Sequence, residues 1–163
     1  FLDSDDLWTR DKLKKQIFFM KQNLVDVSHT SYYIINYNNK IIGSRRAKDM
    51  NHKLLLHSCD IGLSTVIMKK KIITNEIKFA NINTKEDYVL WLKITLNNYT
   101  IFALKNNLTK WRKLNDSLSA SKIQKFYDGY LVYRKYMNFS LLKSFISLLL
   151  LSFNYLLKEF RNK

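Results

Sequence analysis

The chain has 163 residues and a mass of 19.5 kDa, and hydrophobic residues make up 47% of it and charged residues 25%. This composition suits one folded domain with a substantial core and excludes general disorder. The formal net charge of +15 favours anionic partners, such as nucleic acid, nucleotide diphosphates or acidic lipid, without choosing among them. The single cysteine, Cys59, excludes an internal disulfide and favours a reducing compartment.

The opening segment, Phe1–Asp6, places two apolar residues before three carboxylates within six positions. This pattern predicts a buried strand that ends at a site. Carboxylates this close raise each other's pKa unless a cation lies between them. A few carboxylates together with phosphate oxygens are ligands that Mg²⁺ prefers. The alternative is a solvated acidic turn that caps a helix beginning near Thr9.

A helix and a hairpin are predicted next. The helix begins near Thr9 and follows apolar residues at helical spacing, namely Leu13, Ile17, Met20 and Leu24. Two β-prone runs, residues 32–35 and 40–42, flank Asn38-Asn39, which predicts a β-hairpin.

The remaining elements continue this alternation. We expect a short helix over residues 47–57, a strand over 65–68, an amphipathic helix over 85–97, a short β-run over 99–104, and helix from 121 to the end. Strands that alternate with helices and then give way to helices predict an α/β domain with a C-terminal helical tail.

The last part of the tail, residues 139–163, is unusually apolar, because no charge lies between Lys143 and Lys158. The uncharged stretch is shorter than the roughly 20 residues that a membrane span needs. Its polar residues fall on one narrow stripe, namely Lys143, Ser147, Asn154, Lys158 and Arg161. The pattern predicts an amphipathic helix at an anionic membrane surface. Docking on the domain core or on a second subunit, and a true span, remain the alternatives.

A second acidic feature, Lys85-Glu86-Asp87-Tyr88, lies at the start of the predicted helix over 85–97. Thr84 and Asp87 have the spacing of a capping box, and acids in a first helical turn complement the helix dipole. A carboxylate held in this way also has a fixed direction, which suits a general base.

Four motifs then stand in order along the chain: Phe1–Trp8, Ile61–Val66, Glu86–Trp91, and Trp111-Arg112 with Asn115–Ser119. They resemble, in turn, the D-x-D segment, the small-residue acceptor loop, the E-D-x-x-L-W helix start and the late donor loop of family-two inverting glycosyltransferases. The resemblance implies the GT-A fold, a mixed sheet with flanking helices.

The resemblance also implies residue roles. Asp5 would bind the metal, Mg²⁺ or Mn²⁺, that bridges the donor diphosphate, although Asp6 could serve instead. Asp3 would contact the donor ribose or the same metal, and Arg112 the donor phosphates. Asp87 would be the catalytic base that takes the proton from the acceptor hydroxyl. The acceptor contacts would be Gly62, Ser64, Thr65 and Glu86.

On this resemblance, residues 1–118 form part of a catalytic domain that lacks its nucleotide-binding half, and residues 119–163 form the helical tail. The expected function is transfer of a sugar, with inversion, from a nucleotide-sugar donor to a saccharide or lipid-linked acceptor in bacterial cell-surface polysaccharide synthesis. The expected location is the cytoplasm, at the inner face of the cell membrane. The alternatives are a basic nucleic-acid-binding module, which would leave two acidic clusters unexplained, and a non-catalytic membrane-associated scaffold.

Overall fold

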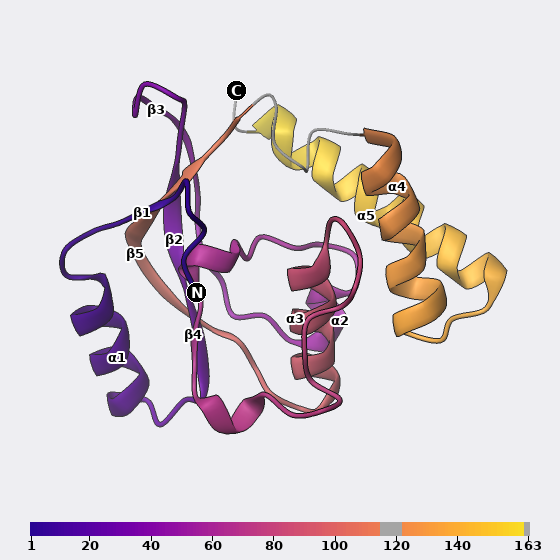
Figure 1. The fold of residues 1–163 in the computed structure, drawn as a ribbon, viewed down its shortest axis with the longest axis horizontal. Coiled ribbons are helices and arrows are strands. Elements are labelled where there is room, and N and C mark those ends of the chain that lie inside the picture. The colour runs from indigo at the N-terminus through magenta and orange to yellow at the C-terminus, as the bar shows by residue number, and fades with distance from the viewer. Residues whose placement is uncertain (115–121, 162–163) are drawn as a thin grey trace.

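A computed structural model describes residues 1–114 and 122–161, which form a mixed sheet with helices on both sides (Figure 1). The strands are β1 (Leu7–Trp8), β2 (Val27–Ile35), β3 (Ile41–Arg45), β4 (Ile67–Met68) and β5 (Phe102–Arg112). Their order is β1-β5-β2-β3, and β4 pairs with the start of β2.

The centre of the sheet is the parallel pair of β2 and β5, in which Ser28 lies opposite Phe102 and Ile35 opposite Arg112. The other pairs, β1 with β5, β2 with β3 and β2 with β4, are antiparallel. Parallel neighbours need a long crossover connection. Here the connection carries β3, β4 and a buried helix, so the predicted α/β class is correct.

The helices are α1 (Lys12–Gln22), α2 (His52–Leu55), α3 (Glu86–Leu96), α4 (Lys122–Leu131) and α5 (Leu141–Arg161), and a π-helical turn, Val132–Tyr136, follows α4. In Figure 1, α1 covers one side of the sheet, while α2 and α3 lie on the other side with α4 and α5 beyond them. The core is centred on α3, where Trp91 and its neighbours on both sides are fully buried. The predicted helix over 85–97 is therefore confirmed.

Other predicted elements differ in extent. The hairpin is present, with Asn39 at φ 62° in its turn. The strand expected over 65–68 is instead a 3-10 turn, η1 (Leu63–Thr65), followed by the short β4. The run expected over 99–104 is the longer β5, so Trp111-Arg112 ends a strand and is not a loop. The helix expected over 47–57 is limited to α2. The rest of the late loop, Asn115–Ser119, and the boundary at 118 lie outside the described residues.

The opening segment does not form the buried strand predicted for it. Phe1 and Leu2 are exposed, a turn covers Ser4 and Asp5, and the first strand begins at Leu7. The Phe1 ring instead packs edge-on against the ring of Phe79, with a centroid distance of 5.5 Å. No strand lies beside residues 1–3 among those described, so this segment runs as a loop over the core.

Helix α1 turns its polar side inward. It buries Lys12 and Gln16 and exposes Leu13 and Ile17, which is the reverse of a usual amphipathic helix. The reason is a buried polar network: Lys12 Nζ donates to Gln16 Oε1 at 2.7 Å, and Gln16 Nε2 donates to the Ser28 carbonyl at 3.1 Å.

Helix α5 is docked on the domain through three members of the predicted polar stripe, Ser147, Asn154 and Lys158. Ser147 is buried, as is Ser144 outside the stripe, and Asn154 Nδ2 donates to the His57 carbonyl at 3.0 Å. Lys158 Nζ pairs with Asp60 at 2.8 Å and donates to Ser58 Oγ at 2.6 Å. The docking alternative is therefore correct for this face.

The opposite face of α5 is apolar and exposed. It presents Leu141, Leu142, Phe145, Ile146, Leu149, Leu150, Phe153, Leu156 and Leu157. By length and composition, residues 141–158 are sufficient to cross a membrane, with a mean hydropathy of 1.4, and 22% of this window is buried. An exposed apolar face of this kind is typical of a surface that contacts protein or lipid.

The connection into α3 also differs from the capping box suggested by the sequence. The N-cap is Lys85, at φ 65°, and its side chain makes no capping hydrogen bond. The Thr84 amide and hydroxyl instead donate to Asp128 Oδ2, at 2.8 and 2.9 Å. Asp128 lies on α4 and is 2% exposed, so one buried carboxylate joins α4 to the start of α3.

We predict that Asp128→Ala lowers the free energy of unfolding by about 2–3 kcal/mol, because the buried Thr84 amide loses its acceptor. Urea denaturation measures this change. Asp49→Ala is the matched control: Asp49 accepts from the Ala103 amide at 2.8 Å in an exposed position, where water can replace the carboxylate. Its expected cost is below about 1 kcal/mol. Equal costs for the two variants would contradict the role given to burial.

Candidate functional site

The site is organised around Ser64, which is 1% exposed in the η1 turn. The Asp3 amide donates to Ser64 Oγ at 3.0 Å, and Trp8 Nε1 donates to the Ser64 carbonyl at 2.7 Å. Thr109 Oγ1 on β5 reaches the same carbonyl at 3.4 Å. These three bonds fix the acidic opening segment against the sheet, although Ser64 is more than fifty positions away in sequence.

The three opening carboxylates have different surroundings. Asp6 is buried, and its Oδ1 accepts from the Arg112 amide at 2.8 Å at the end of β5. Burial raises the pKa of Asp6. Asp3 and Asp5 are both partly exposed, and burial followed by the charge of Asp5 raises the pKa of Asp3. Asp6 thus has a contact within the fold, while Asp3 and Asp5 present a shared negative charge toward solvent.

The Arg112 side chain joins the opening segment to the β2–β3 turn. Its Nε donates to the Asp5 carbonyl at 2.8 Å, its Nη1 to the Asn36 carbonyl at 3.0 Å, and its Nη2 to Asn39 Oδ1 at 2.8 Å. A contact between Arg112 and donor phosphates stays a prediction, because the structure shows the guanidinium bound to protein oxygens.

Asp87 lies in the first turn of α3, half-buried, and its Oδ1 accepts from the Tyr88 amide at 2.7 Å. Burial, the neighbouring Glu86 and the charge of Asp3 raise the pKa of Asp87 to about 6. The Phe1 ring lies 6.4 Å from the ring of Trp91 on the same helix. The structure therefore places the opening segment beside the helix whose first turn carries Asp87.

The predicted acceptor residues fall into two groups. Ser64 and Thr65 are buried, and Thr65 Oγ1 donates to the Gly62 carbonyl at 2.6 Å, so both hydroxyls have partners inside the fold. Gly62 and Glu86 are partly exposed. An acceptor role for these four residues stays a prediction.

Two site-forming residues, Lys12 and Gln16, have no part in the motifs. Gln16 Nε2 donates to the Thr65 carbonyl at 3.0 Å, so α1 supports the η1 turn from behind. The Lys12 ammonium lies 4.5 Å from the centre of the Trp8 ring, and burial lowers its pKa to about 8. Their spacing of four on the side of α1 opposite to its apolar residues was the available signal.

The opening carboxylates are the candidate metal site. Among residues 1–114 and 122–161, no group of three or more His, Cys, Asp or Glu side chains is arranged to hold an ion. Asp3 and Asp5 repel each other and are partly exposed, which fits a divalent cation that takes its other ligands from phosphate and water.

A scan against models of known protein families gives no match. Among curated proteins, the chain is 37% identical over 127 residues to the Escherichia coli UDP-Glc:alpha-D-GlcNAc-diphosphoundecaprenol beta-1,3-glucosyltransferase WfgD, covering 76% of this chain and 49% of that protein. It is 29% identical over 137 residues to the putative teichuronic acid biosynthesis glycosyltransferase TuaG of Bacillus subtilis, covering 83% and 54%. The chain therefore spans about half the length of the curated relatives it matches.

A crystal structure of S. aureus TarS, residues 1–349 in complex with UDP-GlcNAc, superposes with a TM-score of 0.59 at 16% identity. The match covers 91% of this chain and 45% of that one. At this identity the likeness concerns the fold alone. It confirms the predicted mixed sheet with flanking helices and a C-terminal helix.

We predict that Asp87 titrates near pH 6 and that Glu86→Gln lowers this pKa, because the substitution removes a neighbouring negative charge. Carboxyl NMR titration measures both values, and Glu76→Gln, in an exposed loop, is the control. Since the folded state favours protonated Asp87, its contribution to stability should decline as the pH rises from about 4 through about 6. A pKa near 4 in the unsubstituted protein would contradict the burial of this carboxyl.

Proposed function

Because this chain is related to bacterial glycosyltransferases over 76% of its length, as its motifs predict, we propose that the complete protein transfers a sugar from a nucleotide-sugar donor to a saccharide or lipid-linked acceptor. The names of the relatives support this proposal: WfgD is named for UDP-Glc and a diphosphoundecaprenol-linked GlcNAc, and TuaG for teichuronic acid biosynthesis. TarS, whose fold is similar, was crystallised in complex with UDP-GlcNAc. A role in cell-surface polysaccharide synthesis follows.

One observation carries the proposal: the opening segment, which holds the carboxylates, packs against α3 with the Phe1 and Trp91 rings 6.4 Å apart, and the charge of Asp3 makes a small contribution to the raised pKa of Asp87. A transferase needs a group that neutralises the leaving diphosphate close to a group that activates the acceptor hydroxyl. If these acidic residues only capped separate helices and turns, the fold would not need to place the opening segment beside α3.

Asp87 is proposed as the general base. Above pH 6 it is mostly ionised, so it can accept the proton of an acceptor hydroxyl as that oxygen attacks the anomeric carbon. The bond from this carbon to the donor diphosphate breaks on the opposite side, so the configuration inverts and the electron pair leaves with the diphosphate. A positioned base of this kind contributes about 10²–10⁴-fold in rate.

Asp5 and Asp3 are proposed to hold Mg²⁺ or Mn²⁺. Such an ion would offset the negative charge that develops on the leaving diphosphate. Asp5 is favoured over Asp6 because the side chain of Asp6 is buried on the Arg112 amide. Arg112 would then act by fixing the backbone of Asp5 through the bond to its carbonyl.

The apolar face of α5 is proposed to lie on the inner surface of the cell membrane, with the enzyme in the cytoplasm. The polar stripe of this helix is bound to the domain, so its apolar residues are left to face the lipid. Ile123 and Phe126 of α4 are exposed as well. The net charge of +15 favours an anionic bilayer.

We predict that Asp87→Asn lowers the rate of transfer at least 10²-fold while donor binding is retained, because the amide still accepts from the Tyr88 amide but cannot take a proton. Transfer of labelled sugar to a lipid-linked acceptor and calorimetry with a UDP-sugar and Mn²⁺ measure the two effects. Asp49→Asn, in an exposed position, is the control. Near-normal turnover in Asp87→Asn would remove Asp87 from the mechanism.

A second prediction concerns the membrane. Replacing Leu149 and Phe153 by Glu places two charges on the exposed face of α5 and should weaken binding to phosphatidylglycerol vesicles more than tenfold. Replacing the exposed Leu24 and Tyr37 by Glu gives the same change of charge elsewhere and should leave most binding intact. Vesicle co-sedimentation measures both. If the α5 variant binds as well as the control, protein rather than lipid covers this face.

A further inference from the structure

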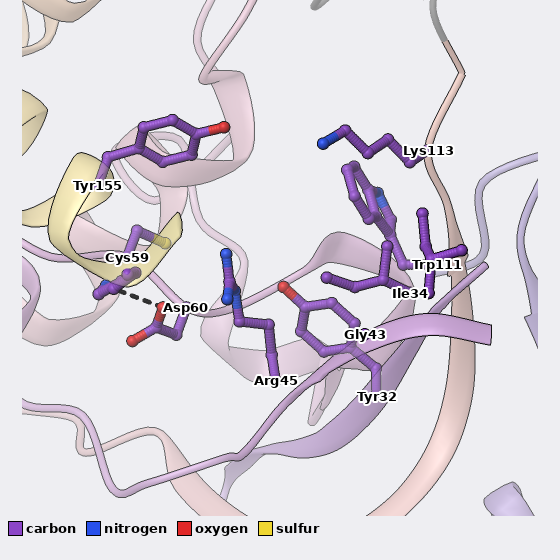
Figure 2. Close-up of a pocket in the computed structure, with 11 residues that line it drawn as sticks. Tyr32, Ile34, Gly43, Arg45, Cys59, Asp60, Trp111, Lys113 and Tyr155 are labelled. Carbon is purple, nitrogen blue, oxygen red and sulfur yellow. Dashed lines mark ion pairs between the residues drawn. The ribbon is translucent and has the colours of Figure 1, made fainter. Parts of the chain in front are cut away.

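A cavity of about 260 Å³ lies between the sheet and α5 (Figure 2). Its walls come from the β2–β3 hairpin, the end of β5, the Cys59-Asp60 segment and the last turns of α5. At ~30 Å³ for each water molecule, this volume is comparable to that of one sugar phosphate. None of the residues assigned above to catalysis or metal binding lines it.

Among the described residues, cationic side chains outnumber carboxylates in the lining. It contains three cationic side chains, Arg45, Lys113 and Lys158, and one carboxylate, Asp60, from the part of the chain that the structure describes. Lys158 and Asp60 pair with each other at 2.8 Å. In Figure 2 the side chains of Arg45 and Lys113 rise from opposite sides of the cavity. An arginine fork with a nearby lysine is suited to a phosphate oxyanion.

The same cavity has aromatic walls. Trp111 and Tyr155 stand on opposite sides of it, and the Tyr32 hydroxyl points toward Arg45 at its base (Figure 2). Burial raises the pKa of Tyr32, so its hydroxyl stays protonated and can donate a hydrogen bond. Flat apolar rings combined with a few fixed polar groups are typical of a small-molecule site.

The cavity adjoins the candidate active site. Gly62 packs against the Tyr32 ring, and a Cβ atom added at Gly62 would lie 3.9 Å from Tyr32 Cε1. Cys59, in the cavity wall, is near enough to Asp87 for that carboxylate to add to the burial that raises the thiol pKa to about 12. A ligand in the cavity would therefore lie beside the proposed base, and α5 places the exposed apolar surface next to it.

We propose that this cavity binds a sugar phosphate, with the phosphate between Arg45 and Lys113 and the sugar ring against Trp111. The proposal rests on the function given above, and in that reaction the ligand is the phosphate-bearing sugar of the acceptor. Its hydroxyl would be directed to Asp87 while its phosphate is held on the far side.

The test is an NMR chemical-shift titration of the complete protein with glucose 1-phosphate, inorganic phosphate and glucose. Glucose 1-phosphate should bind at least tenfold more tightly than either of the other two. Lys113→Gln should weaken glucose 1-phosphate and inorganic phosphate about tenfold, as expected for one charge-assisted contact. Trp111→Leu should weaken glucose 1-phosphate and leave inorganic phosphate unchanged.

Lys110→Gln is the matched control, because Lys110 lies on the same strand and outside the cavity lining. It should bind all three probes as the unsubstituted protein does. Equal losses in Lys110→Gln and Lys113→Gln, or no binding of glucose 1-phosphate to the unsubstituted protein, would overturn the proposal.

A lipid headgroup is the other source of phosphate. Binding of phosphatidylglycerol vesicles should be unchanged in Lys113→Gln, and a loss equal to that for glucose 1-phosphate would assign the cavity to lipid instead. The experiments distinguish a failure of the proposed base, Asp87, from a failure of the proposed cavity site. Retained transfer in Asp87→Asn would refute the base and leave the cavity standing, whereas unchanged probe binding in Lys113→Gln would refute the cavity alone.

Discussion

The turn centred on Ser64 is the constraint on which the site depends. Its backbone carbonyl accepts from Trp8 and Thr109, and its hydroxyl accepts from the Asp3 amide, so one buried residue holds the opening segment and β5 together. Hydrogen bonds inside the fold cannot be exchanged for water without loss. The positions of Asp3 and Asp5 therefore follow from a residue that is itself hidden from any ligand.

Local sequence patterns predicted the elements whose buried side follows from the spacing of their own apolar residues. The apolar residues of 86–96 form a buried helix, and the Asn38-Asn39 pair lies in a hairpin turn. The patterns predicted helices at α1 and α5 but not the side that each buries. Apolar spacing implies an inward apolar face, whereas Gln16 and Asn154 make polar bonds that fix the opposite orientation. Those bonds join residues far apart in sequence, so no local window contains them.

The same distinction applies to the site. The resemblance implied one catalytic site that uses both the opening carboxylates and Asp87, and the opening segment packs against α3 through Phe1 and Trp91. The separate environments of Asp5 and Asp6 were beyond reach, because the contact that buries Asp6 comes from Arg112 at the other end of the domain. The charged cavity was equally hidden, since its walls come from four segments that no motif joins.

The place of β5 in the sheet has a consequence for biosynthesis. This strand lies between β1 and β2, yet it is the last of the five to leave the ribosome. Among the described strands, β1 has no neighbour and one edge of β2 is open until residue 112 has emerged, so the nascent chain exposes unpaired backbone while residues 36–112 are synthesised. Closure by a parallel strand from such a distance is intrinsically slow. Chaperone capture of the growing chain would protect that open edge until the strand arrives.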